Sequence, residues 1–246
     1  MRESRQRTFT LPETELDIYE FCFWAGNKTG QATGKEVLSV TLKKYLQGLK
    51  AWHTFHDSPY PIITEKKVAL ILKSSAKLEA TFPKKSQKKA VMIEHLIVLA
   101  NDLSTGSLED LAILDMALIA FWGLARLGEL TLDQGVGGDL GVYTYDVDIS
   151  SKTATIELRR SKTAAPGESQ FLKLKQLTNI LCPVKAVSRR LAGRGTPSRH
   201  LFGYTKKDRF IPLSKYRVKK RLADVWGRNG YHGLSGHSFR VGGARS

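Results

Sequence analysis

The sequence predicts an α+β protein that is mainly helical and holds one small antiparallel β-sheet. Apolar residues recur at every third or fourth position over most of the chain, which is typical of amphipathic helices. Alternation of apolar and polar residues appears only between residues 142 and 174, where it predicts short strands. Of the 246 residues, 41% are hydrophobic and 25% are charged, so the chain has a globular composition and can form a substantial core.

The first third of the chain is predicted to be helical. Pro12 suits the first turn of a helix, with Thr10 as its cap. A second helix is predicted for residues 36–55, which end before the proline-containing segment 58–61, and a third for residues 64–80.

A basic segment, residues 82–89, separates two predicted domains. Pro83 ends the preceding helix, and the lysines that follow it are expected to be solvated. We therefore predict a helical domain at residues 1–83 and a second domain at residues 84–246. The lysines of this segment form either an ordinary loop or a contact with a DNA backbone, and they are Lys84, Lys85, Lys88 and Lys89.

The second domain combines further helices with the predicted sheet. Its predicted helices span residues 90–101, 108–132, 182–191 and 214–228, and its strands residues 142–149, 153–160 and 170–174. Glycines between residues 135 and 141 predict a loop before the first strand. The most apolar stretch, residues 108–124, contains three acidic residues, so it is predicted to be a buried core helix and not a membrane span.

The chain is strongly basic. Lysine and arginine total 39 and aspartate and glutamate total 23, giving a net charge of +16. Such an excess attracts polyanions, and double-stranded DNA is the partner we expect; a merely basic protein, or one that visits anionic membranes, is the alternative. Cys22 and Cys182 are isolated and predict neither a disulfide framework nor a zinc site. The polar N-terminus predicts a protein that is not secreted.

Two weak motifs are set aside. Residues 30–35 hint at a phosphate loop, but Thr29 and Glu36 stand where that loop needs glycine and serine or threonine. His53 and His56 have the spacing of helical metal ligands, but histidines at an exposed helix end are far more often plain polar residues. We therefore predict no metal, no cofactor and no small-molecule substrate.

The first of three stronger motifs is Ala125-Arg126-Leu127-Gly128-Glu129-Leu130. It places an arginine at the end of a strongly apolar helix, where burial is costly unless an anion meets the guanidinium. Glu129 either forms a local salt bridge with Arg126 or orients the guanidinium towards a phosphate.

The second motif is Arg159-Arg160-Ser161-Lys162-Thr163, at the tip of the predicted hairpin. Lys162 lies nearest the turn and could reach a substrate, although a hairpin lysine is usually only solvated. Lys152 and Arg160 are alternatives on the same sheet.

The third motif runs from Gly236 to Ala244 and puts His237 and Arg240 at positions i and i+3 of a predicted helix, with Ser235 as N-cap. The small residues Gly242 and Gly243 would allow close packing behind them. In the preceding helix, Lys215 and Lys219 are candidates for contacts with the DNA backbone, or are part of a solvated surface.

Together, the first and third motifs resemble the two boxes of the tyrosine recombinases, the phage-integrase-like family. The amino-acid sequence of the second box, residues 236–244, is most similar to that of recombinases of fungal or other eukaryotic mobile elements. The resemblance implies a helical core-binding domain followed by a catalytic domain, and a homo-tetramer on DNA for a full-length member. A type IB topoisomerase shares the chemistry but fits the boxes less well, and an unrelated basic helical module would make both boxes accidental.

In this family a tyrosine hydroxyl attacks the scissile phosphate, giving a 3′-phosphotyrosine intermediate without metal or nucleotide. By resemblance, Arg126 and Arg240 would hold the non-bridging oxygens and Lys162 would protonate the leaving oxygen. His237 would assist proton transfer, and Glu129 would support the site from behind.

The family places the attacking tyrosine some tens of residues after the second box. The eight tyrosines of this sequence all precede Arg240. We therefore expect a catalytic domain that is incomplete at its C-terminus and inactive alone, or an inactive DNA-binding remnant. Such a protein is expected in the nucleus of a eukaryotic host and otherwise in the cytoplasm.

Overall fold

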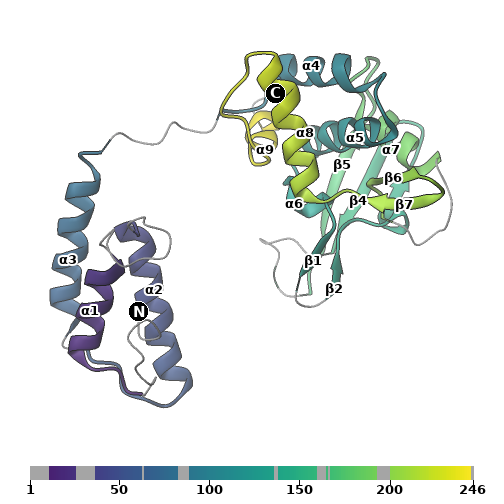
Figure 1. Cartoon of the computed structure of the whole chain (residues 1–246). Coiled ribbons are helices and arrows are strands. Elements are labelled where there is room, and N and C mark those ends of the chain that lie inside the picture. Colours follow the sequence, from purple (N-terminus) through teal and green to yellow (C-terminus); the bar gives the residue numbers. More distant parts are fainter. Residues whose placement is uncertain are drawn as a thin grey trace. The chain divides into compact units, whose positions relative to one another are not determined.

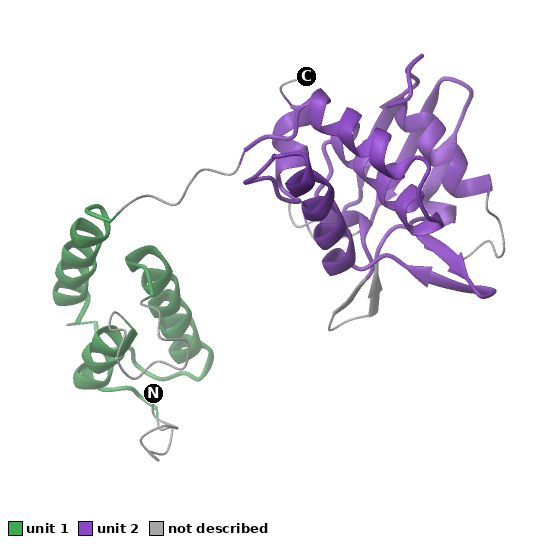
Figure 2. Ribbon diagram, turned by 45° about the horizontal axis from the view of Figure 1, so that its top comes forward, with its two compact units in different colours: residues 1–85 green, residues 86–246 purple. Residues whose placement is uncertain are grey.

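The computed structural model describes residues 11–25, 37–62, 64–82, 89–135, 138–159, 165, 167–192 and 200–244. Helices dominate, and the sheets are small and antiparallel, which confirms the predicted α+β class. The chain divides into two compact units, residues 1–85 and 86–246 (Figure 2).

Unit 1 is a three-helix unit built around one small apolar cluster. Its helices are α1 (Glu15–Ala25), α2 (Ser39–Phe55) and α3 (Thr64–Glu79) (Figure 1). The cluster is formed by the apolar faces of all three helices, and its buried members are Ile18, Cys22, Ala25, Leu42, Leu46 and Val68. The predicted helices are thus present, but α1 begins at Glu15, after Pro12, and α2 begins three residues later than expected; Thr10 lies outside the described residues.

The buried histidine of unit 1 serves the fold. His53 is fully buried in α2, where its Nδ1 lies 2.8 Å from the carbonyl oxygen of Leu49. Its Nε2 accepts a hydrogen bond of 3.0 Å from the backbone N–H of Glu13. Both ring nitrogens are therefore occupied, which removes His53 as a candidate metal ligand.

Unit 2 is built around α5 (Leu108–Trp122), whose residues 112–121 are all buried. The helices packed against it are α4 (Ile93–Leu103), α6 (Leu127–Leu130), α7 (Pro183–Ala192) and α9 (Ser238–Gly243) (Figure 1). The helix α8 (Lys215–Arg228) packs against α4. The apolar stretch is thus a core helix, as predicted. Among the described helices, none is long and apolar enough to cross a membrane.

The predicted three-stranded antiparallel sheet is present, but its first strand begins five residues later than predicted. Strand β4 (Thr153–Leu158) pairs with β3 (Val147–Ile149) on one side and with β5 (Gln170–Lys175) on the other. The register joins Val147 to Ile156 and Leu158 to Gln170. Alternate residues of β4 are buried, which is the pattern from which the strand was predicted.

Two further hairpins escaped prediction. Residues 135–141 were predicted as a loop, but β1 (Asp133–Gly135) and β2 (Gly138–Leu140) form an antiparallel pair there. The second hairpin joins β6 (Gly203–Lys206) to β7 (Arg209–Pro212).

The turn between β6 and β7 explains why that hairpin was missed. Lys207 and Asp208 adopt positive φ angles of 49° and 58°, which suit the twist of a tight hairpin. Asparagine and glycine are the usual signal for such a turn. The sequence offers lysine and aspartate instead, so the turn has no clear signature.

Gly242 and Gly243 let α9 lie very close to the backbone of neighbouring segments, as predicted. A β-carbon at Gly242 would overlap the carbonyl oxygen of Val91, and one at Gly243 would overlap that of Phe121 at the end of α5. Because rigid backbone atoms fill this space, neither position can accept a side chain without moving α9.

We predict that Gly243→Ala lowers the free energy of unfolding by about 1–3 kcal/mol, the usual cost of overpacking. The matched control is Gly227→Ala in α8, where an added β-carbon meets no atom within 4 Å. That change should stabilise the helix by up to about 1 kcal/mol. Urea unfolding of both variants measures the difference, and equal effects would contradict the proposed close approach.

Candidate nucleic-acid interface

Arg126 lies beyond the end of α5, and not on it as predicted. The helix stops at Trp122, and Leu124 turns the chain with a positive φ of 53°. Arg126 is then extended and caps the short helix α6. The predicted single helix over residues 108–132 is therefore wrong, because the chain turns at Leu124 and a separate short helix follows.

Glu129 holds Arg126 at two points. Its Oε2 accepts a hydrogen bond of 2.9 Å from the backbone N–H of Arg126, and its Oε1 lies 2.6 Å from the guanidinium Nη1. The Glu129 side chain is 9% exposed and the Arg126 side chain 29% exposed. The local salt bridge is therefore present, and it engages one nitrogen of a guanidinium that has five N–H donors.

His237 and Arg240 lie at the beginning of α9 and within it. Helix α9 begins at Ser238 with His237 at the cap position, so the prediction of Ser235 as N-cap is wrong. Ser235 instead donates its backbone N–H to the Ser238 hydroxyl at 2.9 Å. His237 is exposed and Arg240 half-buried. Within the described part of the chain, no acidic side chain pairs with Arg240.

The two boxes meet through a glycine contact. A β-carbon at Gly236 would lie 3.2 Å from Cδ1 of Leu127, so the residue before His237 packs on the residue after Arg126. The contact of α9 with the end of α5 holds the same region together. Arg126, His237 and Arg240 thus come from segments far apart in sequence to one part of unit 2.

A lysine from α8 joins this region. A β-carbon at Gly128 would lie 3.1 Å from Nζ of Lys215, so the ammonium group sits against α6, two residues from Arg126. Sequence reasoning placed Lys215 only on a general backbone-binding surface. No local signal could have shown this contact, since it depends on how α8 packs in three dimensions.

Helix α8 carries two different sets of cations. Arg217 pairs with Glu109 at 2.7 Å and Arg221 with Asp110 at 2.6 Å, so these arginines tie α8 to α5. By contrast, Lys215, Lys219 and Lys220 are exposed and have no acidic partner among the described residues. With Tyr216 they line an open surface pocket.

Some predicted residues cannot be placed. Lys162, Lys84, Lys85 and Lys88 lie outside the described residues. Lys89 is described: it is exposed, and its backbone N–H donates to the carbonyl oxygen of Gly233 at 3.1 Å.

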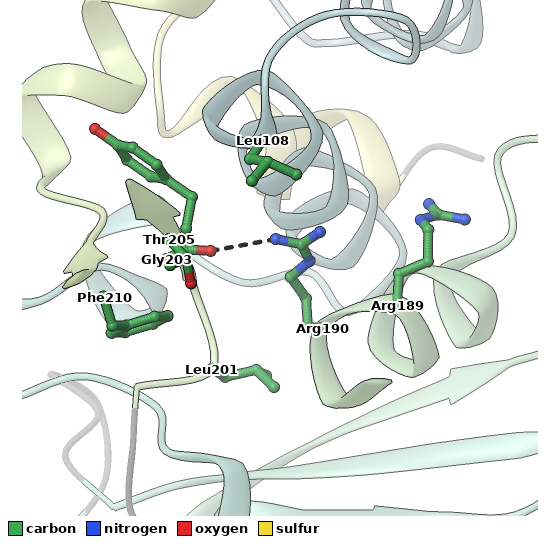
Figure 3. Close-up of a pocket in the computed structure, with 8 residues that line it drawn as sticks. Leu108, Arg189, Arg190, Leu201, Gly203, Thr205 and Phe210 are labelled. Atoms are coloured by element: carbon green, nitrogen blue, oxygen red, sulfur yellow. Dashed lines mark hydrogen bonds between the residues drawn. The ribbon is translucent and has the colours of Figure 1, made fainter. Parts of the chain in front are cut away.

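A second cluster of arginines lies on α7 and serves the core. Arg189 and Arg190 both pair with Asp115, a fully buried residue of α5, at 2.5 and 2.6 Å. Arg190 also reaches the carbonyl oxygen of Gly203 at 3.2 Å (Figure 3). Burial raises the pKa of Asp115, and the two arginines act in the opposite direction.

The cavity beside these arginines is an unsuitable ligand site. It measures about 150 Å³ and is lined by Arg189, Arg190, Leu201 and Phe210, among others (Figure 3). Pockets for small organic ligands usually measure about 300–1,000 Å³. The described residues also contain no cluster of histidine, cysteine, aspartate and glutamate that could hold a metal ion.

Comparison with known proteins finds similarity only among solved structures. No family model matches the chain, and no curated protein matches it. The XerH site-specific recombinase, bound to its difH substrate in a pre-cleavage complex, matches with a TM-score of 0.43 and 11% identity over 85% of this chain and 59% of that chain. The XerA recombinase matches with a TM-score of 0.39 and 14% identity over 97% of this chain and 77% of that chain.

This chain therefore spans about three fifths of the length of the XerH chain. At these low scores, the likeness carries no functional weight.

The ion pair of Asp110 on α5 with Arg221 on α8 predicts that the stability of the fold falls in acid. Partial burial raises the pKa of Asp110, but hydrogen bonds from Arg221 and Ser107 outweigh it, so the pKa lies below its ordinary value. Ionised Asp110 therefore stabilises the fold above its unfolded-state pKa of about 3.9, and this contribution is lost as the pH falls through the lower folded-state pKa.

We expect Asp110→Asn to flatten the decline in unfolding free energy as the pH falls below about 5, because a paired carboxylate with a lowered pKa loses its contribution between about pH 5 and its folded-state pKa. Asp208→Asn removes the same charge from the exposed β6–β7 turn and serves as the control. Urea unfolding across this range tests the ion pair. A profile for Asp110→Asn that matches the unmodified chain would show that the carboxylate does not contribute.

Proposed function

We propose that this protein binds double-stranded DNA and grips a backbone phosphate in the manner of a tyrosine recombinase. The observation that carries the proposal is the close contact of Gly236 with Leu127, which brings the segment just before His237 against the segment just after Arg126. The excess of 39 basic over 23 acidic residues supports a polyanionic partner.

In this proposal, Arg126 and Arg240 donate to the non-bridging oxygens of one phosphodiester. Guanidinium groups suit this task because their planar donors match two phosphate oxygens at once. Glu129 keeps Arg126 in place, and this orientation favours the charge that builds up when the phosphate is attacked. His237 would transfer a proton at the attacking oxygen, and Lys162 would protonate the leaving oxygen.

The exposed side of α8 supports the same partner. Lys215 and Lys219 have no acidic partner within the described ranges, whereas Arg217 and Arg221 on the same helix are paired. Unpaired lysines cost little to bring to a phosphate, since no salt bridge must first be broken. We propose that these two lysines and Lys89, with Lys84, Lys85 and Lys88, contact the backbone beside the gripped phosphate.

We also propose roles for the two domains and a mode of assembly. Residues 1–83 would act as the core-binding domain, residues 84–246 as the catalytic domain, and full-length protomers would assemble as a tetramer on DNA. We propose a eukaryotic mobile element as the source, because of the amino-acid sequence of the second box, Gly-His-Ser-Phe-Arg-Val-Gly-Gly-Ala.

We expect the chain to bind duplex DNA with an affinity that falls steeply between about 50 and 200 mM salt. Each lysine that contacts a phosphate contributes about 0.9 to the slope of log affinity against log salt concentration. The double change Lys215→Ala and Lys219→Ala should therefore reduce this slope. Arg228→Ala, on the same helix but paired with Asp102 and Asp224, should leave it unchanged. Absent or salt-independent binding by the unmodified chain would refute the proposal.

A DNA-binding protein that does not cut is the second candidate, and the packing of Tyr231 favours it. Tyr231 packs on His95 with ring centroids 4.5 Å apart, and Tyr216 projects from α8 with 72% of its surface exposed.

A nicked suicide duplex separates the two candidates. We expect the 246-residue chain to bind it without forming a covalent adduct, as judged by denaturing electrophoresis. An adduct would show that one of the present tyrosines attacks, and mass spectrometry of the linked peptide would identify it.

A further inference from the structure

A second arginine of unit 2 is held in the same way as Arg126. Arg159 follows the end of β4, and its Nη2 lies 2.5 Å from Oδ1 of Asp146. The Asp146 side chain is 1% exposed, and its Oδ2 accepts a hydrogen bond of 2.8 Å from the backbone N–H of Tyr143. The carboxylate is thus tied to backbone on one oxygen and to a guanidinium on the other, as Glu129 is.

An aromatic column supports the guanidinium from the side. The Arg159 guanidinium carbon lies 4.6 Å from the centroid of the Tyr145 ring. Tyr145 stacks on Tyr143 at 5.1 Å and 9°, and Tyr143 packs against His200 at 4.3 Å. The cation–π contact and the ion pair both favour this orientation of Arg159.

Arg159 nevertheless remains accessible. Its side chain is 51% exposed, and Tyr145 is 52% exposed. Asp146 is its single acidic partner in the part of the chain that the structure describes, and it engages one nitrogen of a fork that has five N–H donors. The remaining donors can bind an anion without breaking the pair.

The aromatic column of Tyr145, Tyr143 and His200 lies close to the segment that follows Arg126 and α6. A β-carbon at Gly141 would lie 3.1 Å from Nδ1 of His200 and 3.6 Å from Cα of Leu132. The backbone N–H of Leu132 donates to the carbonyl oxygen of Leu213 at 3.2 Å, just before α8 begins. The column and the Lys215 end of α8 therefore belong to one connected part of unit 2.

We infer that Arg159 is a preoriented binding site for a phosphodiester of the DNA backbone, with Asp146 and Tyr145 as its positioning residues. The inference rests on the proposed function, since it assigns a further contact to the same DNA. Preorientation matters because ordering a free arginine on binding costs affinity, and a side chain that is already held avoids that cost.

The variants Asp146→Asn and Asp148→Asn test this inference, because it predicts opposite directions of change in affinity for duplex DNA from those expected of charge alone at Asp146. Each change removes one negative charge from the same short segment, and Asp148 is exposed on β3. If charge alone mattered, both variants would bind duplex DNA more tightly. If Asp146 orients Arg159, Asp146→Asn should bind about two- to tenfold more weakly, the cost of one immobilised side chain. Asp148→Asn should not weaken binding.

Two exposed variants keep the test independent of folding at the buried Asp146. Arg159→Ala should reduce the salt slope by about 0.9, the value for one phosphate contact, and Tyr145→Leu should weaken binding without lowering the slope. Fluorescence titrations of the full chain with a duplex, with thermal unfolding as a folding check, measure both.

The failures of the two proposals are distinguishable. If the unmodified chain binds duplex DNA with a steep salt slope but Arg159→Ala leaves affinity and slope unchanged, the inference is wrong and the proposed function stands. If Asp146→Asn folds normally and binds as tightly as Asp148→Asn, the positioning role is wrong. If the unmodified chain does not bind duplex DNA, both proposals fail.

Discussion

The candidate site depends on the close approach of α9 to the end of α5. Gly242 lies against the carbonyl of Val91 and Gly243 against that of Phe121, with no space for a β-carbon at either position. This packing fixes where α9 begins, and therefore where His237 and Arg240 lie. Gly236 then packs on Leu127, and Arg126 is the next residue back along the chain. Glycine is required here for space, not for backbone conformation.

A second constraint is the division of the basic side chains between the fold and the surface. Arg189 and Arg190 neutralise the buried Asp115, and Arg217 and Arg221 hold α8 to α5. A carboxylate buried without such partners would cost several kcal/mol, roughly 3–5 by comparison with broken buried pairs. These arginines therefore stabilise unit 2, and a high net charge alone would have overstated the surface available to DNA.

Arg126 and Arg159 form an intermediate group. Each pairs with a carboxylate that also accepts a backbone N–H, so the carboxylate cannot move with the arginine. Each guanidinium keeps part of its donor fork exposed. A carboxylate in this position does not compete fully with a phosphate, because it engages one edge of the guanidinium and leaves another for the ligand.

Much of the fold could be predicted because local patterns control it. The buried helix α5 and the three-stranded sheet follow from apolar periodicity, although α5 ends at Trp122 and the first strand begins only at Val147. Predictions failed where local patterns are silent. The break after Trp122 depends on a positive φ at Leu124, a residue that rarely adopts it, and the β6–β7 turn depends on Lys207 and Asp208 in the same way. Ser235 failed as a cap because α9 begins only at Ser238, and the backbone N–H of Ser235 donates to the Ser238 hydroxyl within a turn.

The amino-acid sequence by itself determined the basic character of the protein, its apolar core segments and the two boxes that contain Arg126, His237 and Arg240. Tertiary structure alone decided which cations remain unpaired, since partners such as Asp115 and Arg190 are far apart along the chain. It also decided that Lys215 lies beside Gly128 and that Arg159 is held by Asp146 and Tyr145. The physical reason is that charge and periodicity are local properties, whereas pairing and orientation depend on which surfaces the packed core brings together.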